Sequence, residues 1–481
     1  MPTESHSLSP KRVAWPRPSA ARKSVPALVA AVPLALGGGS RPYEGRSRFV
    51  LTPLTLTLDQ FLFLITAALL ALGLIMVQSA DSRIREVHEN WLTQAFSNKN
   101  AIHAGLALLA MTLTWRMDYR WLLGRAPQIN YDGTQEKWWR LFFMPSTWLV
   151  IVTLGFLVAV LVTPFGKTIN GARRWFSVGP LGFQPSELAK LSLVVFVSAF
   201  AVQRAGVIRS FWKGFLPLVA IFGIASVLVI KEDFGTTVLI AAVVIGLILM
   251  AGCRWWHVAM LIPPGVFVVW ASIFRDPTSF RYRRMMAFMD PLSDPQGAGY
   301  HPLQSLMTIM SGGFWGKGLG NGIQKMGYLP EDNTDFIFAV ICEELGFVGA
   351  AMVVALFAGF VLVGWRIMSR CNNLFGKMVA FGITAIIGLQ AAINIAVVTV
   401  SMPTKGIALP LISSGGTGWI MNAAAIGLLM SIERHNRREA DSIRHTHSAS
   451  QGFPVEIAVP AIPRVPATPM VPAVPLSPAA S

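Results

Sequence analysis

The chain has 481 residues, of which 53% are hydrophobic and 13% are charged, against about 25% charged in soluble domains. Apolar runs of about 18 to 25 residues recur along it, so the composition excludes a soluble globular protein. The net charge of +16 comes mainly from basic residues in short loops between these runs. That pattern favours anionic lipid over nucleic acid, so we expect an all-α, polytopic integral membrane protein with no nucleic-acid partner.

Residues 1–50 are basic and rich in proline, serine and alanine, which predicts a disordered cytoplasmic tail. The apolar stretch Val25–Leu36 contains two prolines and is too short to span a membrane, which favours a tail over a cleaved signal peptide. Residues 436–481 are predicted to form a second disordered, Pro/Ala-rich cytoplasmic tail. Prolines recur there at every third position, a period that suits a spacer or a docking strip in the polyproline II conformation.

The membrane domain between the tails, residues 51–435, is predicted to contain about ten transmembrane helices with a large outer loop between the seventh and eighth. Cys253, Cys342 and Cys371 have neither metal-site nor disulfide spacing, so we interpret them as packing residues. The expected spans are 58–80, 101–116, 147–164, 186–203, 215–230, 236–252, 257–274, 336–365, 378–400 and 407–432.

Lysines and arginines predict the orientation of these spans. An even number of spans places both termini on one side, and that side holds 25 of the 40 Lys and Arg residues. The positive-inside rule therefore predicts cytoplasmic termini and places the loop of residues 275–335 outside. Some basic residues run against this bias, and an anionic substrate on the outer face would explain them; snorkelling or local ion pairing is the alternative.

The outer loop of residues 275–335 is a polar island between long apolar runs. It holds Asp290 and Asp294 beside Arg281, Arg283 and Arg284, followed by a glycine-rich stretch and a second acidic group. Loops longer than about 15 residues are usually functional or disordered, and the aromatic residues here argue against disorder. We interpret this loop as the active region.

Three other outer segments share this polar character. In the first, Lys190 lies one turn into a span, where an ionisable residue is a functional candidate or the partner of Glu187 at i,i+3. In the second, Asp233 is placed to cap a helix. In the third, around Lys405, two prolines and a glycine pair interrupt the helix at membrane depth, which is tolerated where the backbone lines a cavity or is buried.

Several of these segments together resemble the SEDS family of FtsW, RodA and SpoVE. The resemblance covers residues 58–435, with ten spans and the motifs in the family's order, and it is closer to the division branch than to the elongation branch. The matching segments are Asn170–Lys190, Asp233–Thr236, Asp294–Pro295 with Gly299–Tyr300, Gly316–Gly320, Thr334–Val340, Glu343–Gly346, Pro403–Gly406 and Ser413–Gly416.

The resemblance implies a peptidoglycan glycosyltransferase that polymerises lipid II on the outer face of the cytoplasmic membrane, during septal wall synthesis and cell division. The family's essential acid lies in the large outer loop, and the matching residue is Asp294. Lys190, Asp233 and Lys405 match other polar positions of the family. It also implies a class B penicillin-binding protein and other divisome proteins as partners.

The implied reaction is a single inverting displacement with one general base, for which Asp294 is the candidate. The outer arginines Arg281, Arg283 and Arg284, with Lys190, Asp233 and Lys405, are candidates for binding sugar and pyrophosphate. Asp290, Glu343 and Glu344 are supporting candidates, with one of the two glutamates expected to face the cavity. Whether a divalent cation, Mg²⁺ or Mn²⁺, bridges acid and pyrophosphate stays open.

Two other functions compete with this one. A lipid II flippase would depend on buried charges such as Lys190 and Asp233, with Asp294 dispensable. A non-catalytic scaffold that recruits a transpeptidase would also tolerate the loss of Asp294.

Overall fold

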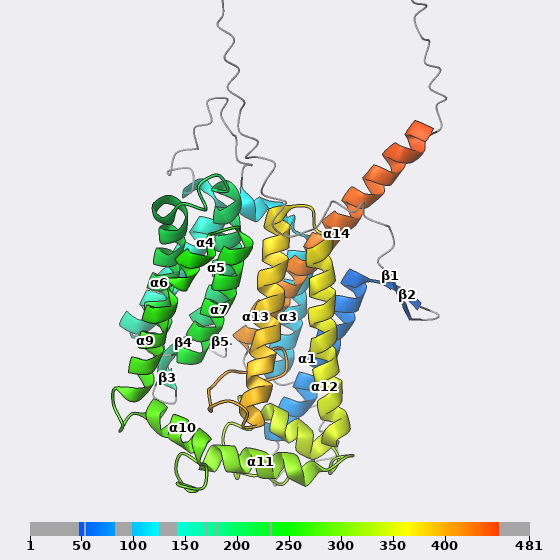
Figure 1. Ribbon diagram of the computed structural model, residues 1–481. Coiled ribbons are helices and arrows are strands. Elements are labelled where there is room, and N and C mark those ends of the chain that lie inside the picture. Colours follow the sequence, from blue (N-terminus) through cyan, green and yellow to red (C-terminus); the bar gives the residue numbers. More distant parts are fainter. Residues whose placement is uncertain are drawn as a thin grey trace, which may run out of the picture.

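The structure is a computed structural model that describes residues 48–51, 54–81, 99–124, 142–169, 172–178, 181–230, 233–414 and 416–451. Its long helices run roughly side by side, and two shorter helices lie across one end (Figure 1). Seven helical segments in this part of the chain are long and apolar enough to cross a membrane, by length and composition. The prediction of an all-α polytopic membrane protein is confirmed.

Each of the ten predicted spans corresponds to a helix or, for the seventh, to a pair of helices. The apolar helix α7 is shorter than the seven segments above, and α3 and α14 carry more polar residues. The helices are α1 (Leu58–Asp81), α3 (Lys99–Arg116), α4 (Pro145–Val162), α5 (Pro185–Gln203), α6 (Leu216–Ile230), α7 (Phe234–Met250), α8 and α9 (Trp255–Ala259, Ile262–Phe274), α12 (Ile337–Arg370), α13 (Leu374–Val398) and α14 (Thr417–Gln451).

The last span begins ten residues later than predicted, because the chain from Thr399 to Gly416 is not helical up to Thr417. Pro403 and Pro410 each remove a backbone donor that a helix would need. Leu409, Leu411 and Ile412 of this connection are nevertheless buried, at 1%, 1% and 0% exposure. The interrupted backbone is therefore enclosed by protein, as such a segment requires at membrane depth.

Helix α14 also corrects the predicted start of the C-terminal tail. It continues beyond residue 436 to Gln451, and Asn436 and Ala440 are buried. Arg437 bonds to Asp59 of α1, with Nη2 2.6 Å from Oδ2. The polar composition of this stretch suggested a tail, whereas its first residues, as far as Ala440, are buried or ion-paired against the bundle, and the end of α14 projects beyond it (Figure 1). Residues 1–47 and 452–481 lie outside the described residues.

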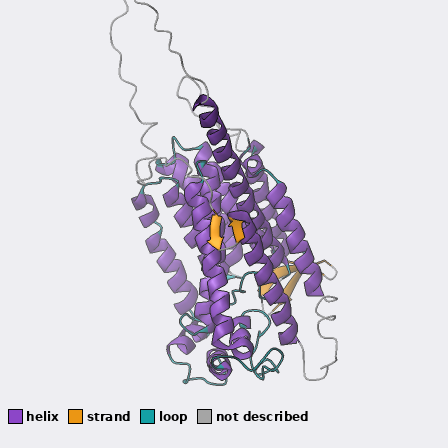
Figure 2. Cartoon of the chain, turned by 90° about the vertical axis from the view of Figure 1, so that its right-hand side faces the viewer, coloured by secondary structure: helices purple, strands orange, loops and turns teal. Residues whose placement is uncertain are grey.

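Two small antiparallel sheets accompany the helices (Figure 2). Strands β1 (Arg48–Leu51) and β2 (Leu54–Thr57) pair directly before α1, so β1 begins inside the predicted N-terminal tail. Strands β3 (Gly166–Ile169), β4 (Ala172–Val178) and β5 (Leu181–Phe183) pair in that order. Phe183 of β5 packs against Phe156 of α4, with ring centroids 5.4 Å apart. Neither sheet was predicted, and the second one carries Arg174.

Helices α10 (Phe280–Met289) and α11 (Tyr300–Gly312) lie across the bundle at what we call the loop end (Figure 1). The Ser279 side chain caps α10 by accepting the N–H of Tyr282 at 3.2 Å. The Ser305 hydroxyl of α11 donates to the carbonyl of Val398 at 2.7 Å, at the end of α13. The polar island is therefore an ordered cover held against the bundle.

The apolar core has two main parts that meet at α13. One lies among α1, α3, α12 and α14, and includes Phe375 and Val379 of α13. The other lies among α4, α5, α6 and α7, and includes Met378 and Ile386 of α13. Helix α13 thus supports the loop-end segments of both halves, where the candidate site forms.

Candidate active site

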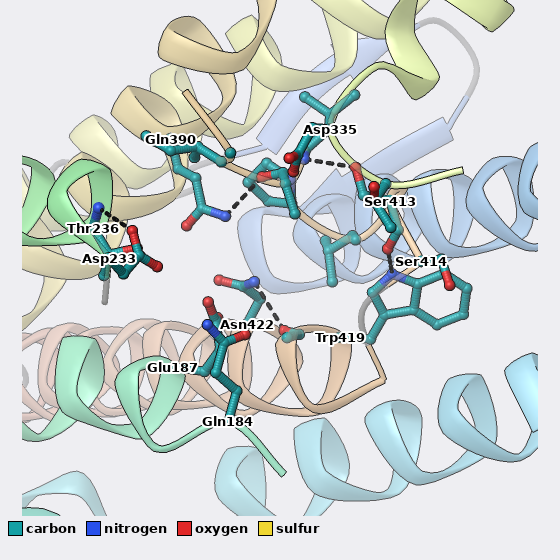
Figure 3. A pocket seen from close by; sticks show the side chains of 18 of the residues that line it. Gln184, Glu187, Asp233, Thr236, Asp335, Gln390, Ser413, Ser414, Trp419 and Asn422 are labelled. Carbon is teal, nitrogen blue, oxygen red and sulfur yellow. Dashed lines mark hydrogen bonds between the residues drawn. The ribbon is translucent and has the colours of Figure 1, made fainter. Parts of the chain in front are cut away.

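A cavity of about 270 Å³ lies between segments from the two halves of the bundle. Its wall is built from segments distant in sequence: β4, the first turns of α5, α7 and α14, the loop before α12, α13, and the connection after α13 (Figure 3). Charged and polar side chains on this wall are Arg174, Gln184, Glu187, Asp233, Thr236, Glu331, Thr334, Asp335, Gln390, Ser413, Ser414 and Asn422.

Asp233 lies on this wall and also caps α7, as its position before the helix predicted. Its Oδ1 accepts the N–H of Thr236 at 2.9 Å, and its Oδ2 accepts the Thr236 hydroxyl at 2.8 Å. Arg174 of β4 places Nη1 3.6 Å from Oδ2 of the same carboxylate. The predicted cap is therefore present, and the sheet places a cation beside the same carboxylate on the cavity wall.

Lys190 lies directly behind the wall. Its ammonium group is 2.8 Å from Glu187 Oε2 and donates to Gln390 Oε1 at 2.7 Å. The Lys190 side chain is 4% exposed, whereas Glu187 and Gln390 line the cavity. The i,i+3 pair that the sequence suggested is present, and it links Lys190 to two groups that can meet a ligand.

Asp335 is a further cavity acid, located two residues before α12 begins (Figure 3). Its backbone carbonyl accepts Asn394 Nδ2 at 2.8 Å, which fixes this part of the chain on α13. Desolvation raises the pKa of Asp335 to about 7, and nearby Glu331 acts in the same direction. A carboxyl group with this pKa exchanges its proton near neutral pH.

Two arginines of the polar island, and Lys405 of the connection after α13, lie beside the cavity and outside its described lining. Arg281 donates to the carbonyl of Ile230 at 3.0 Å, and Arg284 to that of Thr404 at 3.4 Å. Lys405 Nζ lies 5.2 Å from the centre of the Phe234 ring, and desolvation lowers its pKa. Arg283 is exposed. The two bonded arginines connect α10 to the ends of the loops that form the wall.

Asp294 occupies an exposed turn between α10 and α11, outside the described lining of the cavity. Its carboxylate accepts the N–H of Gly297 at 3.0 Å and of Ala298 at 2.9 Å. Asp290, also exposed, accepts the N–H of Leu292 at 3.1 Å. In this structure each carboxylate is engaged by backbone donors of its own turn, and the two do not form a shared site.

Glu343 and Glu344 are fully buried and anchor the glycine-rich stretch, and neither belongs to the described cavity wall. Glu343 Oε1 is 2.7 Å from Lys317 Nζ and accepts the N–H of Ile323 at 3.1 Å. Glu344 Oε1 is 2.8 Å from Lys325 Nζ. Both glutamates therefore support the outer loop from inside.

The described residues contain no group of three or more His, Cys, Asp or Glu side chains arranged to hold a metal ion. On the cavity wall, Glu187 is paired with Lys190, Asp233 is bonded to Thr236, and Glu331 accepts the Thr334 hydroxyl.

A family model described as cell cycle protein, covering FtsW, RodA and SpoVE, matches residues 59–438. The chain belongs to this family. A probable peptidoglycan glycosyltransferase FtsW from Aliivibrio salmonicida is 37% identical over 383 residues, covering 79% of this chain and 90% of the relative. Stage V sporulation protein E of Bacillus subtilis is 34% identical, covering 79% and 98%.

Solved structures with a similar fold also match this chain. A chain from a peptidoglycan synthase complex that coordinates polymerization and crosslinking matches with a TM-score of 0.59 and 26% identity, covering 78% of this chain and 97% of that one. Rod shape determining protein RodA of Thermus thermophilus matches with a TM-score of 0.51 and 25% identity, covering 78% and 96%. The overall fold is thus shared with these solved structures.

Among the predicted site residues of this family member, Asp233 lies on the cavity wall and Lys190 lies directly behind it. Sequence reasoning missed Asp335, Glu331 and Arg174 as residues of one wall. One sequence feature could have identified Asp335: it is an acid directly before a long apolar run, and it lies inside a motif of the family. Its closeness to Asp233 depends on the packing of α7 beside α13, which no local pattern reveals.

Proposed function

We propose that this protein is a peptidoglycan glycosyltransferase that polymerises lipid II, a disaccharide-peptide carried on undecaprenyl pyrophosphate, during septal wall synthesis and cell division. Its family membership and the names of its FtsW relatives support this function. The structural observation that carries it is the cavity, where acids and a cation from separate segments face one space at the loop end of a membrane bundle. A transfer between sugars needs such groups for hydroxyls, a proton and a pyrophosphate.

We propose further that the loop end faces outward from the cytoplasmic membrane, with both termini in the cytoplasm and the protein at the septum. The excess of lysine and arginine on the side of the termini supports this orientation. Lipid II would then enter the cavity from the outer leaflet with its pyrophosphate near the membrane surface.

In the proposed reaction, the 4-hydroxyl oxygen of the acceptor N-acetylglucosamine attacks the anomeric carbon of the donor sugar. The bond between that carbon and the pyrophosphate oxygen breaks, and the pyrophosphate leaves with the electron pair, so the configuration inverts. Asp294 takes the hydroxyl proton, since its exposed turn can be reached by an acceptor arriving at the loop end.

The leaving pyrophosphate gathers negative charge, which the basic groups near the cavity would stabilise. Arg174 lies on the wall, and Arg281, Arg284 and Lys405 lie beside it. Lys190 keeps Glu187 in a neutral pair, which reduces repulsion between the wall and the phosphates.

We also propose a class B penicillin-binding protein as a partner, within the divisome. The similarity to a chain of a complex that coordinates polymerization and crosslinking supports this pairing. A transpeptidase held beside the loop end would receive each new strand as it leaves the cavity.

The test supplies lipid II to the purified protein, with and without such a partner, and measures glycan polymer. Asp294→Ala should abolish polymer formation. Asp276→Ala is the matched control, because Asp276 is also an exposed loop aspartate that holds a turn, through Thr278. Equal polymer from wild type and Asp294→Ala would refute the role of Asp294. Lipid II movement across vesicles without polymer would favour the flippase.

A further inference from the structure

Asp335 differs from the other acids of the cavity in its surroundings. A Cβ atom at Gly406 would lie 2.9 Å from its Oδ2, so this carboxyl group rests directly against the connection that carries Lys405. Because Gly406 has no side chain, the carboxyl group of Asp335 has room at this position. Asn394 holds the backbone of Asp335 from the other side. The backbone of Asp335 is thus held on α13, and its carboxyl group lies at the cavity wall against Gly406.

The other three cavity acids each have a hydrogen-bonding or charged partner. Asp233 is bonded to Thr236 and lies near Arg174, Glu187 pairs with Lys190, and Glu331 accepts the Thr334 hydroxyl at 2.7 Å. Within the described residues, no hydrogen bond or ion pair reaches the carboxyl oxygens of Asp335. Asp335 is the acid of this wall that is left to interact with a ligand.

The charged groups around Asp335 do not provide an ion-pair partner for its carboxyl group. Glu331 of the same loop and Asp233 ahead of α7 raise its pKa, whereas Arg174 of β4 and Arg284 of α10 lower it by less than burial raises it. Burial lowers the pKa of His301 on α11, whose ring stacks on Phe336. Glu187 of α5 also faces the cavity and is paired with Lys190. Gln390 of α13 and Asn422 of α14 face it and are uncharged. Lys405 lies over the Phe234 ring.

We propose that Asp335 binds the pyrophosphate-linked substrate in its protonated form, and that loss of this proton weakens binding. The inference rests on the proposed function and adds a residue to its site. A protonated carboxyl group donates a hydrogen bond to a phosphate or sugar oxygen, whereas a carboxylate at the same position repels the pyrophosphate. Asp335 is a binding residue in this proposal, and Asp294 retains the role of base.

The test measures binding of fluorescently labelled lipid II to the purified full-length protein in detergent between pH 6 and pH 9, with Asp294→Ala present throughout so that bound lipid II is not polymerised. In the protein with Asp335 intact, the Kd should rise above pH 7 and approach about a tenfold increase per pH unit, because one proton must be taken up on binding. Asp335→Asn keeps the shape and the uncharged state, so its Kd should stay nearly constant and close to the wild-type value at pH 6.

Glu331→Gln provides an independent arm. It removes a negative charge that raises the pKa of Asp335, so the increase in Kd should begin at a lower pH than in the wild type. Polymerisation kinetics of the same variants with Asp294 intact separate binding from chemistry, since Asp335→Asn should remove the rise of KM with pH.

Two results would overturn the proposal: an unchanged rise of Kd with pH in Asp335→Asn, or a loss of kcat at every pH with KM unaffected, which would make Asp335 the base. Because binding is measured without turnover, these results differ from failure of the proposed function, in which bound lipid II gives no polymer. Thermal unfolding of each variant verifies that it folds.

Discussion

The ammonium nitrogen of Lys325 lies 2.8 Å from Oε1 of Glu344, and both side chains are buried, with 1% and 0% exposure. Ser79 of α1 also donates to Glu344 at 2.8 Å. This cluster joins the glycine-rich outer stretch to two membrane helices. Since such a pair is completely removed from water, each partner depends on the other.

Removing one partner should therefore destabilise the protein strongly. Glu344→Ala and Lys325→Ala should each cost about 3–5 kcal/mol, because an uncompensated charge is left buried. The double variant Lys325→Met/Glu344→Leu should lose less than either single variant. Thermal unfolding in detergent measures this, and additive losses in the double variant would contradict it.

Two glycines of the same stretch should respond very differently to alanine. Gly316 (φ +80°) and Gly320 (φ +83°) have similar left-handed backbones. A Cβ at Gly316 would lie 2.2 Å from the carbonyl oxygen of Glu344, whereas one at Gly320 would meet no atom within 4 Å. Gly320→Ala should cost only the conformational strain, about 1 kcal/mol. Gly316→Ala should cost considerably more in unfolding measurements, and equal losses would show that the close approach is unimportant.

The extension of α14 beyond residue 436 can be tested through Arg437. Its partner Asp59 is buried, so Arg437→Ala should cost about 3 kcal/mol. Arg120→Ala is the matched control, because the pair Arg120–Glu439 is 42% exposed on both sides and should contribute under about 1 kcal/mol. Similar unfolding temperatures for the two variants would argue against a docked extension.

The pKa of Asp335 predicts how stability depends on pH. With a pKa of about 7 in the folded state and about 4 when unfolded, folded Asp335 keeps a proton that the unfolded chain has lost between these values. Stability should therefore fall as pH rises from 4 to 7. Asp335→Asn should be more stable than wild type, by a margin that grows between pH 5 and pH 7 by up to about 1.4 kcal/mol per pH unit. A constant difference in unfolding temperature would contradict this.

Lys190 allows structure and activity to be separated. Lys190→Met should lower both, since it leaves Glu187 without its cation and Gln390 without a donor. Lys190→Met/Glu187→Gln should recover thermal stability, while lipid II polymerisation stays roughly 10- to 100-fold below wild type because the wall geometry is altered. Recovery of both properties would assign Lys190 a structural role alone.

Local patterns in the sequence predicted the elements well and their long-range contacts poorly. Apolar runs located the helices, and the position of Asp233 directly before α7 identified it as a cap. The same patterns did not reveal that Glu343 and Glu344 point into the folded outer loop, or that Asp335 shares a wall with Asp233. Hydropathy reports which residues leave water, whereas these contacts depend on which helices become neighbours.

The contact between Lys190 and Gln390 also has a consequence for biosynthesis. The two residues are 200 positions apart, so at a synthesis rate of about 5–20 residues per second the lysine waits roughly 10–40 s for its amide partner. Glu187, three residues earlier, is already present when Lys190 is made. The local pair with Glu187 can therefore neutralise Lys190 while the remaining helices are inserted.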